Sequence, residues 1–356
     1  MWFLGLDVGG ANIKAAALQV LKGETAQLRQ ASKYFPIWKQ GKEKLPEAVK
    51  QTLEELKVSS CEAAGVTMTA ELSDVYESKR EGVTHVLEVV SQTLRETGFK
   101  VVSVEGRLIP VDEALRNPLK VASANWAASG WLLSRLVENA ILCDVGSTTT
   151  SIIPVKDGRL AAKGLTDLEK LALGELVYTG ALRTSLAAIV KTLKVRGTPT
   201  RISAEYFAST GDVYLALKEI SPEDYTVETP DGRGKSLREA LARLARTVCA
   251  DLEAIGEKEA LKIALQVAEE QQRQIAEALN QVYQRCWGSQ PREGFPIVTA
   301  GVKGGFLAAK SALRAGFHLV KPVDSLLNFK VSRVLPAAAA AYMAAWEALG
   351  GFSLKG

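Results

Sequence analysis

The sequence predicts an α/β protein composed of two related halves with a central cleft between them. Three observations support this class. Apolar runs typical of strands alternate along the chain with segments of helical periodicity. The 356 residues suffice for two domains that each bury a core. One short pattern, an apolar run followed by an aspartate and a turn of small residues, occurs at residues 6–18 and again at residues 143–155.

The repeated pattern sets the expected domain limits. The first domain covers residues 1–137, and the second covers residues 138–335. An alanine-rich helix at residues 336–349 is expected to pack back on the first domain.

The first half begins with two strands joined by a tight turn, because two apolar runs flank the small residues 9–12. Later apolar runs predict buried strands, and amphipathic spacing predicts helices, one of which has Pro46 in its first turn. The expected elements are strands at 2–8 and 13–20, a helix at 46–57, a strand at 63–68, a polar loop at 69–74, a helix at 83–97, a strand at 101–104 and a helix at 125–137.

The second half opens with the repeated turn. A stretch rich in turn formers and acidic residues at 221–235 predicts a long loop, and apolar residues at helical spacing from Leu261 to Cys286 predict a long helix. The expected elements are strands at 140–145 and 150–155 joined by a turn at 146–149, helices at 168–176, 180–192, 203–219, 236–254 and 257–287, and a strand at 296–300 that ends in the glycine-rich segment 301–305 before another helix.

The charge and hydropathy patterns argue against nucleic acid and membrane partners. The 44 basic and 40 acidic residues leave a net charge of +4, and the basic residues form no stripe. The longest apolar stretch, near residues 337–345, is shorter than the roughly 20 residues needed to span a bilayer. The first residues lack the basic start of a signal peptide, and Asp7 interrupts their apolar run. We therefore expect a cytoplasmic protein, whose oligomeric state the sequence does not fix.

The cysteines and histidines restrict the possible chemistry. No two cysteines have the C-x-x-C spacing, so we expect four reduced thiols. Only two histidines are present, which argues against a histidine-built metal site and a Ser-His-Asp triad. These residues are Cys61, Cys143, Cys249, Cys286, His85 and His318.

The repeated turn has the features of a phosphate-binding element. A glycine after an aspartate lets the backbone turn sharply, and successive N–H groups in such a turn suit phosphate oxygens. An aspartate beside a phosphate is repelled unless a cation lies between them, so Asp7 and Asp144 are the expected ligands of Mg²⁺ or another divalent cation. The expected phosphate-binding residues are Gly9, Gly10, Asn12, Gly146, Ser147, Thr148 and Thr149.

Simpler interpretations stand beside this one. Each turn could be an ordinary hairpin, although the repetition and the Ser/Thr run favour a diphosphate held by two facing turns. Gly301, after the strand at 296–300, is either a phosphate or nucleotide contact or part of a helix-entry turn. Lys14 either offsets phosphate charge or is a solvated lysine on an edge strand.

The two turns and the segment 301–305 together resemble the sugar kinase, heat-shock chaperone and actin superfamily. This resemblance implies two actin-like, sugar-kinase-like (ribonuclease H-like) domains. Further motifs are similar to one group within it, the hydantoinase/oxoprolinase-like tetrahydromethanopterin-linked C1 transfer pathway proteins, which are related to an archaeal synthase of methanofuran biosynthesis. These motifs, spread over about residues 4–345, are MTAELSD (68–74), REGV (80–83), ASANWAASG (122–130), TGALRT (179–184), AEYFASTGDVY (204–214), TPDGRG (229–234) and ARLARTVCAD (242–251).

The resemblance implies a transferase that joins an aminomethylfuran-methyl diphosphate to the phenol of γ-glutamyltyramine, or a close analogue, and releases pyrophosphate. It implies two small-molecule substrates, a divalent cation and no requirement for ATP. The turns that hold ATP phosphates elsewhere in the superfamily would here hold the diphosphate leaving group. The expected catalytic residues are Asp7, Lys14, Glu71 and Asp144.

Several polar residues in the motifs have two or more interpretations. Glu71 and Asp74 follow a buried strand, where functional residues gather, and either one accepts the phenol proton, binds the furan's ammonium or caps a helix. Asn125 begins a helix, and it and Trp126 either pack beside the cleft or bind substrate, Trp126 by stacking. Arg183 contacts phosphate, contacts the glutamyl carboxylates or forms a surface salt bridge.

Two pairs of charged residues lie on expected helices. Glu205 and Asp212 are seven residues apart and would share a helix face, where they either bind an amine or a second metal or are solvated. Arg243 and Arg246 would pair with Glu239 or nearby acids.

Two other functions remain open from the sequence. One is an ATP-dependent kinase or a hydantoinase-type hydrolase of the same superfamily, which would turn over nucleotide. Ser147 replaces a glycine common in the kinase-type turn, and this difference counts against ATP more than against phosphate. The other is a non-catalytic nucleotide-binding regulator or scaffold, which would carry a large apolar surface patch for its partner.

Overall fold

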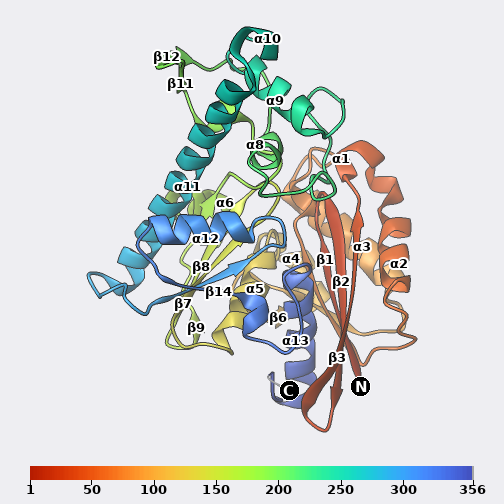
Figure 1. Cartoon of the computed structure of the whole chain (residues 1–356). Coiled ribbons are helices and arrows are strands. Elements are labelled where there is room, and N and C mark those ends of the chain that lie inside the picture. Colours follow the sequence, from red (N-terminus) through yellow and green to blue (C-terminus); the bar gives the residue numbers. More distant parts are fainter. Residues whose placement is uncertain (355–356) are drawn as a thin grey trace. The chain divides into compact units, whose positions relative to one another are not determined.

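The structure, a computed structural model that describes residues 1–354, divides into two compact units (Figure 1). Unit 1 comprises Met1–Leu142, Ile153–Leu173 and the described residues from Pro322 onward. Unit 2 comprises Cys143–Ile152 and Gly174–Lys321. The domain limits and the cleft expected from the sequence stay predictions.

Unit 1 is built on a six-stranded sheet. Its strands are β1 (Trp2–Val8), β2 (Asn12–Leu21), β3 (Glu24–Tyr34), β4 (Ala63–Met68), β5 (Phe99–Val102) and β6 (Leu108–Ile109). They lie in the order β3-β2-β1-β4-β5-β6. β1 pairs antiparallel with β2 and parallel with β4, and β2 pairs antiparallel with β3. The first hairpin therefore lies inside the sheet.

The second sheet repeats this topology. Its strands are β7 (Ala140–Val145), β8 (Thr150–Lys156), β9 (Arg159–Leu160), β10 (Leu176–Val177), β13 (Pro296–Ala300) and β14 (Leu319–Pro322). They lie in the order β10-β8-β7-β13-β14, and β9 pairs with β8. If the two-residue strands β6 and β9 are set aside, both sheets have the order third, second, first, fourth, fifth. The α/β class is confirmed, and the repeated order agrees with two actin-like halves.

Helices separate the strands in both units. Those of unit 1 are α1 (Ile37–Gln40), α2 (Leu45–Glu54), α3 (Lys79–Thr93), α4 (Val111–Arg116), α5 (Asn125–Ser134), α6 (Asp167–Leu173) and α13 (Leu335–Leu349), with short 3₁₀ turns η1 (Lys42–Lys44), η2 (Ala70–Leu72), η3 (Pro118–Lys120) and η4 (Val323–Ser325). Those of unit 2 are α7 (Leu186–Ile189), α8 (Thr210–Ala216), α9 (Leu237–Arg246), α10 (Leu252–Ile255), α11 (Glu257–Trp287) and α12 (Gly305–Arg314). A small separate ribbon joins β11 (Thr192–Val195) to β12 (Thr198–Arg201).

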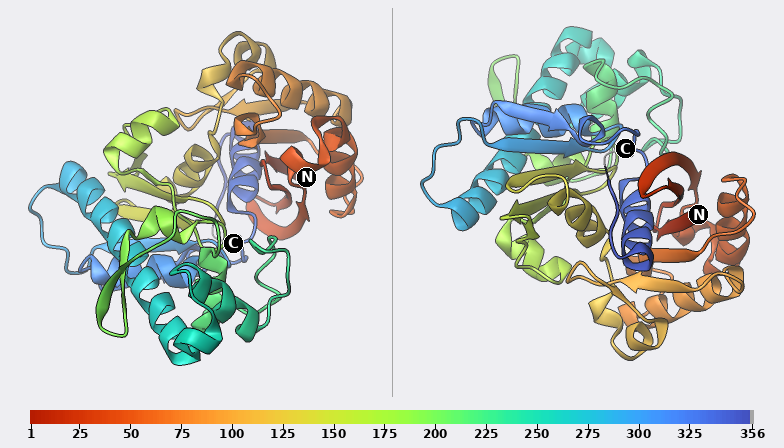
Figure 2. Two further views of the ribbon diagram at one scale, coloured as in Figure 1. Left: turned by 90° about the horizontal axis from the view of Figure 1, so that it is seen from above. Right: turned by 90° about the horizontal axis from the view of Figure 1, so that it is seen from below.

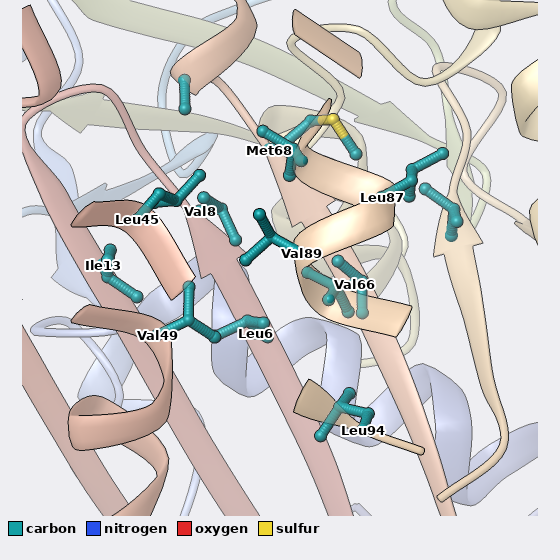
Figure 3. Packing of buried hydrophobic residues seen from close by; sticks show 14 of the residues in the cluster. Leu6, Val8, Ile13, Leu45, Val49, Val66, Met68, Leu87, Val89 and Leu94 are labelled. Atoms are coloured by element: carbon teal, nitrogen blue, oxygen red, sulfur yellow. The ribbon is translucent and has the colours of Figure 1, made fainter. Parts of the chain in front are cut away.

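The core of unit 1 lies between its sheet and the helices α2 and α3 (Figure 3). Alternate residues of β1, Leu4, Leu6 and Val8, enter this core because successive strand residues point to opposite faces. Helical spacing brings Leu45 and Val49 of α2 onto the same cluster. This packing fixes the position at which β1 ends and the first turn begins.

Helix α13 packs against β1, β2, β4 and α5 (Figure 2). It approaches the sheet at two glycines, because an ideal Cβ on Gly5 would lie 1.8 Å from Ala337 O and one on Gly65 would lie 2.3 Å from Ala340 O. Neither glycine has room for a side chain, so the backbone of α13 rests directly on the strands.

Replacing Gly5 by alanine is expected to lower the free energy of unfolding by about 3 kcal/mol or more, because the new methyl group meets backbone atoms that cannot move aside singly. Urea unfolding followed by circular dichroism measures this loss. Gly98→Ala is the matched control, since a Cβ there has nothing within 4 Å. Equal unfolding midpoints for the two variants would contradict the close approach of α13.

Most expected elements are present within a few residues of their predicted limits. β4 and β13 begin and end at the expected residues. The helix expected at 180–192 is wrong, because only α7 is helical there. Instead, Gly180 N donates to Thr184 Oγ1 at 2.9 Å and holds the preceding backbone in a compact loop.

The helix expected at 203–219 is also too long. It is limited to α8, because the Asp212 carboxylate accepts a hydrogen bond from Ser209 N at 3.0 Å and so caps the helix there. Residues 203–208 are irregular.

No helix within residues 1–354 is both long and apolar enough to cross a membrane.

Candidate functional site

The first turn joins β1 to β2, and three of its carbonyl oxygens accept hydrogen bonds from backbone N–H groups. The bonds run from Gly9 N to Asn12 O (3.0 Å), from Ile37 N to Gly10 O (3.0 Å) and from Phe35 N to Ala11 O (2.9 Å). The N–H groups of residues 10 and 11 take no part in these bonds. A turn whose carbonyls are engaged in this way presents N–H groups to a ligand, which favours an anion.

The second turn, between β7 and β8, is closed by a matching bond in unit 2, and its outer donors engage carbonyls one position earlier in the turn. The bonds run from Gly146 N to Thr149 O (2.9 Å), from Ala181 N to Gly146 O (2.9 Å), from Leu182 N to Ser147 O (3.1 Å) and from Arg183 N to Ser147 O (2.9 Å). The segments that supply the outer donors, residues 35–37 and 179–183, are called here the clamp segments. Each follows the third strand of its sheet, β3 or β10.

The clamp segments refine the expected roles of two glycines. Gly9 and Gly146 each use their own N–H to close the turn, so they shape the turns and do not offer that donor to a phosphate. The sequence did not predict either clamp, because backbone-to-backbone bonds between distant segments depend on no particular side chain. The one feature of the sequence that indicates the second clamp segment is Gly180, because a Cβ there would lie 2.5 Å from Thr148 N and would prevent the close contact with the turn.

Asp7 lies near the end of β1, directly opposite Lys14 of β2 in the antiparallel register. The Asp7 side chain is buried, and Lys14 Nζ lies 4.0 Å from its Oδ2. The alternative of a solvated lysine on an edge strand is wrong, because β2 lies between β1 and β3. Lys14 thus adds positive charge beside a buried carboxylate at the first turn.

Glu71 lies in the loop that follows β4, beside the first turn. Thr69 N donates to Val8 O at 2.9 Å, and a Cβ on Gly9 would lie 3.5 Å from Thr69 Oγ1. This contact places the 69–74 loop against the turn residues. β1 and β4 are parallel neighbours, so both functional segments emerge at the same edge of the sheet.

The Glu71 carboxyl is 2% exposed and is held from one side by Ser123. Its Oε1 accepts hydrogen bonds from Ser123 N at 2.7 Å and from Ser123 Oγ at 2.9 Å, and Oε2 has no hydrogen-bond partner within residues 1–354. Burial raises the pKa of Glu71 to about 7, against the opposing effect of the Ser123 hydrogen bonds. A carboxyl with such a pKa can give or accept a proton near neutral pH.

Ser123 was missed by the sequence analysis. Its φ of +53° is uncommon for a residue other than glycine, and this backbone conformation presents both its N–H and its hydroxyl to Glu71. The two residues are 52 positions apart in sequence, so no local pattern joins them.

The helix-cap alternative for Glu71 and Asp74 is wrong. The next helix, α3, is capped by Ser78, whose side chain accepts a hydrogen bond from Glu81 N at 3.2 Å. Asp74 is exposed. Its role in binding substrate stays a prediction.

The glycine-rich segment after β13 packs on the end of β7 in unit 2. A Cβ on Gly301 would lie 2.2 Å from Val145 O, and Gly301 has a φ of +90°, so only glycine fits there. The same Cβ would lie 3.5 Å from Asp144 Oδ1. The segment is a helix-entry turn, since Gly305 N donates to Gly301 O at 2.8 Å and α12 follows. Its contact with a ligand stays a prediction.

Trp126 of the 122–130 motif is part of the packing of unit 1. Asn125 is the first residue of α5. Trp126 is 5% exposed, and Lys170 Nζ lies 3.7 Å from the centre of its ring. The cation thus covers one face of the indole, which leaves little ring surface for substrate stacking.

Arg183 lies at the second turn through both its backbone and its side chain. Its N donates to Ser147 O, and its Nη1 lies 3.5 Å from Thr148 Oγ1. The guanidinium is half-buried beside the expected phosphate-binding residues. Of the three interpretations of Arg183, phosphate contact is the one with which its position at this turn is compatible.

Glu205 and Asp212 do not share a helix face. Glu205 is exposed in the irregular segment before α8, whereas Asp212 is fully buried. Asp212 Oδ1 accepts a hydrogen bond from Arg243 Nε at 2.8 Å. The expected site for an amine or a second metal at Glu205 and Asp212 depended on one helix that carries both residues, and α8 includes only Asp212.

The basic residues of α9 pair with a nearby acid, as one of the expected alternatives has it, and not with Glu239. Arg243 Nη1 and Arg246 Nη1 donate to the two oxygens of Asp231, at 3.0 Å and 2.8 Å. Glu239 instead caps α9 by accepting from Ser236 N at 2.9 Å. These ion pairs order the 229–234 loop.

The carboxylates of Asp7 and Asp144 at the turns suit Mg²⁺ better than they suit a metal ion whose ligands all come from the protein. Residues 1–354 contain no cluster of three or more His, Cys, Asp or Glu side chains suited to hold a metal ion. Mg²⁺ is usually bound by one or two carboxylates together with substrate phosphates and water. Asp7 and Asp144 provide such carboxylates beside N–H-presenting turns.

Comparison with known proteins finds close relatives in archaea. The chain is 37% identical over 262 residues to the (4-{4-[2-(gamma-L-glutamylamino)ethyl]phenoxymethyl}furan-2-yl)methanamine synthase of Methanocaldococcus jannaschii, which covers 73% of this chain and 76% of that protein. It is 45% identical over 129 residues to the protein of the same name from Methanococcus vannielii, which covers 36% of this chain and 58% of that protein.

A solved structure shows the same fold at low sequence identity. The nucleotide-free acetone carboxylase, described with the mechanism of ATP-dependent acetone carboxylation, aligns with a TM-score of 0.53 and 11% identity, over 96% of this chain and 70% of that chain. The hydantoinase/oxoprolinase family model matches residues 62–342, which is most of the sequence. The chain therefore belongs to the hydantoinase/oxoprolinase family.

Proposed function

We propose that this protein is a transferase of methanofuran-type C1-carrier biosynthesis. It joins an aminomethylfuran-methyl diphosphate to the phenol of γ-glutamyltyramine, or a close analogue, and releases pyrophosphate. The observation that carries the proposal is the 37% identity to the archaeal synthase over three quarters of each chain. The two N–H-presenting turns support it, because the reaction releases a strongly anionic leaving group.

The turns would bind the phosphoryl oxygens of the diphosphate. The N–H groups of Gly10 and of Ser147 and Thr148 lie outside the bonds that close and clamp the turns. Hydroxyl groups of the Ser/Thr run add donors at the second turn, and Lys14 adds charge at the first. Donors fixed in advance stabilise the charge that develops as the C–O bond to the diphosphate breaks.

Asp7 and Asp144 would hold the divalent cation, which supplies positive charge to the diphosphate. Asp7 is kept in place by burial on β1, and Asp144 by its position against the segment that begins at Gly301.

Glu71 would accept the proton of the phenol. The phenol oxygen forms a bond to the furfuryl CH₂ carbon, the bond from that carbon to the diphosphate oxygen breaks, and the electron pair leaves with pyrophosphate. The phenol proton passes to Glu71 Oε2, the oxygen that Ser123 does not bind. All atoms and charges balance without an oxidant, a reductant or ATP.

A second candidate is an ATP-dependent reaction, favoured by the shared fold with the ATP-dependent acetone carboxylase. Both reactions use phosphate-binding turns. They differ in the phosphorylated compound that is consumed.

The purified protein, incubated with the furan diphosphate, γ-glutamyltyramine and Mg²⁺ without ATP, is expected to form the ether and pyrophosphate in equal amounts. Mass spectrometry detects the ether, and a coupled assay measures pyrophosphate. A parallel reaction receives ATP and the furan alcohol in place of its diphosphate. Ether formed only in the ATP reaction would overturn the proposal in favour of the second candidate.

A further inference from the structure

A buried side-chain network in unit 2 supports the clamp segment 179–183. Its centre is Gln271 of the long helix α11, a polar residue with no exposed surface. Gln271 Nε2 donates to Thr179 Oγ1 at 2.7 Å and to Gly180 O at 2.9 Å. Both N–H bonds of the amide are thus directed at the first residues of the clamp segment.

Tyr214 of α8 fixes the orientation of this amide. Its hydroxyl donates to Gln271 Oε1 at 2.5 Å, so the oxygen end of the amide faces Tyr214 and the nitrogen end faces the clamp segment. The ring of Tyr214 packs edge-on against Phe306, with centroids 4.8 Å apart. Phe306 directly follows the glycine-rich segment 301–305. Tyr214 therefore contacts both Gln271, which holds the clamp segment, and the residue next to the glycine-rich segment.

The clamp segment lies directly on the turn that it holds. A Cβ on Gly180 would lie 2.5 Å from Thr148 N and 2.7 Å from Gly146 O. A small displacement of Gly180 therefore moves the turn or breaks the bonds from residues 181–183 to its carbonyls. If those bonds break, the Gly146 and Ser147 carbonyls are free to turn toward a bound anion and repel it.

We propose that Gln271, oriented by Tyr214, is a positioning residue for the anion-binding second turn. By holding Thr179 and Gly180, it keeps the N–H groups of residues 181–183 on the carbonyls of Gly146 and Ser147, so that these two carbonyls do not face a bound anion. Gln271 acts through the clamp segment and touches no substrate. The identity of the anion as a diphosphate rests on the proposed function, whereas the support of the clamp does not.

The test compares Gln271→Met, which keeps side-chain length but removes the amide, with Tyr214→Phe, which removes one hydroxyl. The first measurement is the binding of inorganic pyrophosphate with Mg²⁺ by calorimetry. The second is hydrogen exchange at residues 181–183. We expect about tenfold weaker pyrophosphate binding and faster exchange in Gln271→Met, and a smaller change in the same direction in Tyr214→Phe.

Gln274→Met is the matched control, because Gln274 lies on the same helix and its Nε2 donates to Ile189 O at 2.9 Å, away from the clamp. Pyrophosphate binding in Gln271→Met as tight as in the wild type would overturn the proposal. If the wild type itself binds no pyrophosphate, the proposed function fails, and exchange at residues 181–183 alone decides the role of Gln271. Faster exchange then supports it, and unchanged exchange refutes it.

Discussion

Replacing Asp7 by asparagine is expected to lower the rate of ether formation by about a thousandfold, and the same change at Asp144 by a similar factor. Asparagine keeps the size and most of the packing of aspartate but removes the negative charge that a divalent cation requires. Without that cation, the charge that develops on the departing diphosphate meets only the hydrogen-bond donors of the turns and the side chains of Lys14 and Arg183. The loss should appear mainly in kcat, because the leaving-group charge is largest in the transition state.

The measurement is a steady-state rate of ether formation at increasing Mg²⁺ concentration. Each variant should also need more Mg²⁺ to reach half of its maximal rate. Asp157→Asn is the control, since Asp157 is an exposed aspartate in the turn after β8, at the opposite end of that strand from the second turn. Full activity in Asp7→Asn at the wild-type Mg²⁺ requirement would remove Asp7 from the proposed metal site.

Replacing Glu71 by glutamine is expected to lower kcat by 100-fold or more, about the range for loss of a general base. Glutamine can still accept the hydrogen bonds from Ser123, so the loop after β4 should keep its position. It cannot take a proton from the phenol. The wild-type rate should rise with pH through about 7, where the Glu71 carboxyl ionises, and Glu71→Gln should lack this rise.

The same carboxyl gives an independent prediction for stability. Burial holds the pKa of Glu71 at about 7 in the folded state, above its ordinary value of 4.5, so the folded state binds one more proton between these values. The stability contributed by the neutral carboxyl is therefore complete below pH 4.5 and is lost, by about 3 kcal/mol, as the pH rises through 7. Glu71→Gln, neutral throughout, escapes this loss.

Urea unfolding at pH 4.5 and pH 8 measures the difference between the variant and the wild type. Between these pH values, the free energy of unfolding of Glu71→Gln should rise by about 3 kcal/mol relative to that of the wild type. Glu62→Gln, which changes an exposed glutamate just before β4, should show no such shift. A variant with a less active site and a more stable fold at pH 8 would identify Glu71 as a residue retained for chemistry. Equal pH dependence in both variants would contradict a buried, proton-carrying Glu71.

The periodicity of the sequence predicted those helices and strands in which buried positions are apolar and exposed positions are polar. Strand β4, a short run of small and apolar residues, was placed correctly because its burial leaves a direct compositional signal. β3 was missed, because along much of its length its residues are exposed or half-buried and its composition is polar. Its pairing with β2, and not its own composition, makes it a strand.

The twin aspartate-glycine turns were found because each forms within one short stretch of chain. The partners that complete them were not found, because they come from distant parts of the sequence. Ser123, between η3 and α5, is 52 positions from Glu71, and Gln271 reaches Thr179 across 92 positions. The helix expected over Glu205 and Asp212 was predicted too long. Ser209 and Asp212 form a capping box inside that segment, and α8 begins there.

The contact between β1 and α13 affects the order in which the protein can mature during translation. β1 is synthesised before unit 2, and α13 is synthesised after it. All of unit 2 lies between them in the sequence and can fold on the emerging chain, in contrast to the usual N-terminal-first order. A ribosome stalled before residue 335 would hold a nascent chain whose first sheet lacks the contacts that α13 makes with β1, β2 and β4.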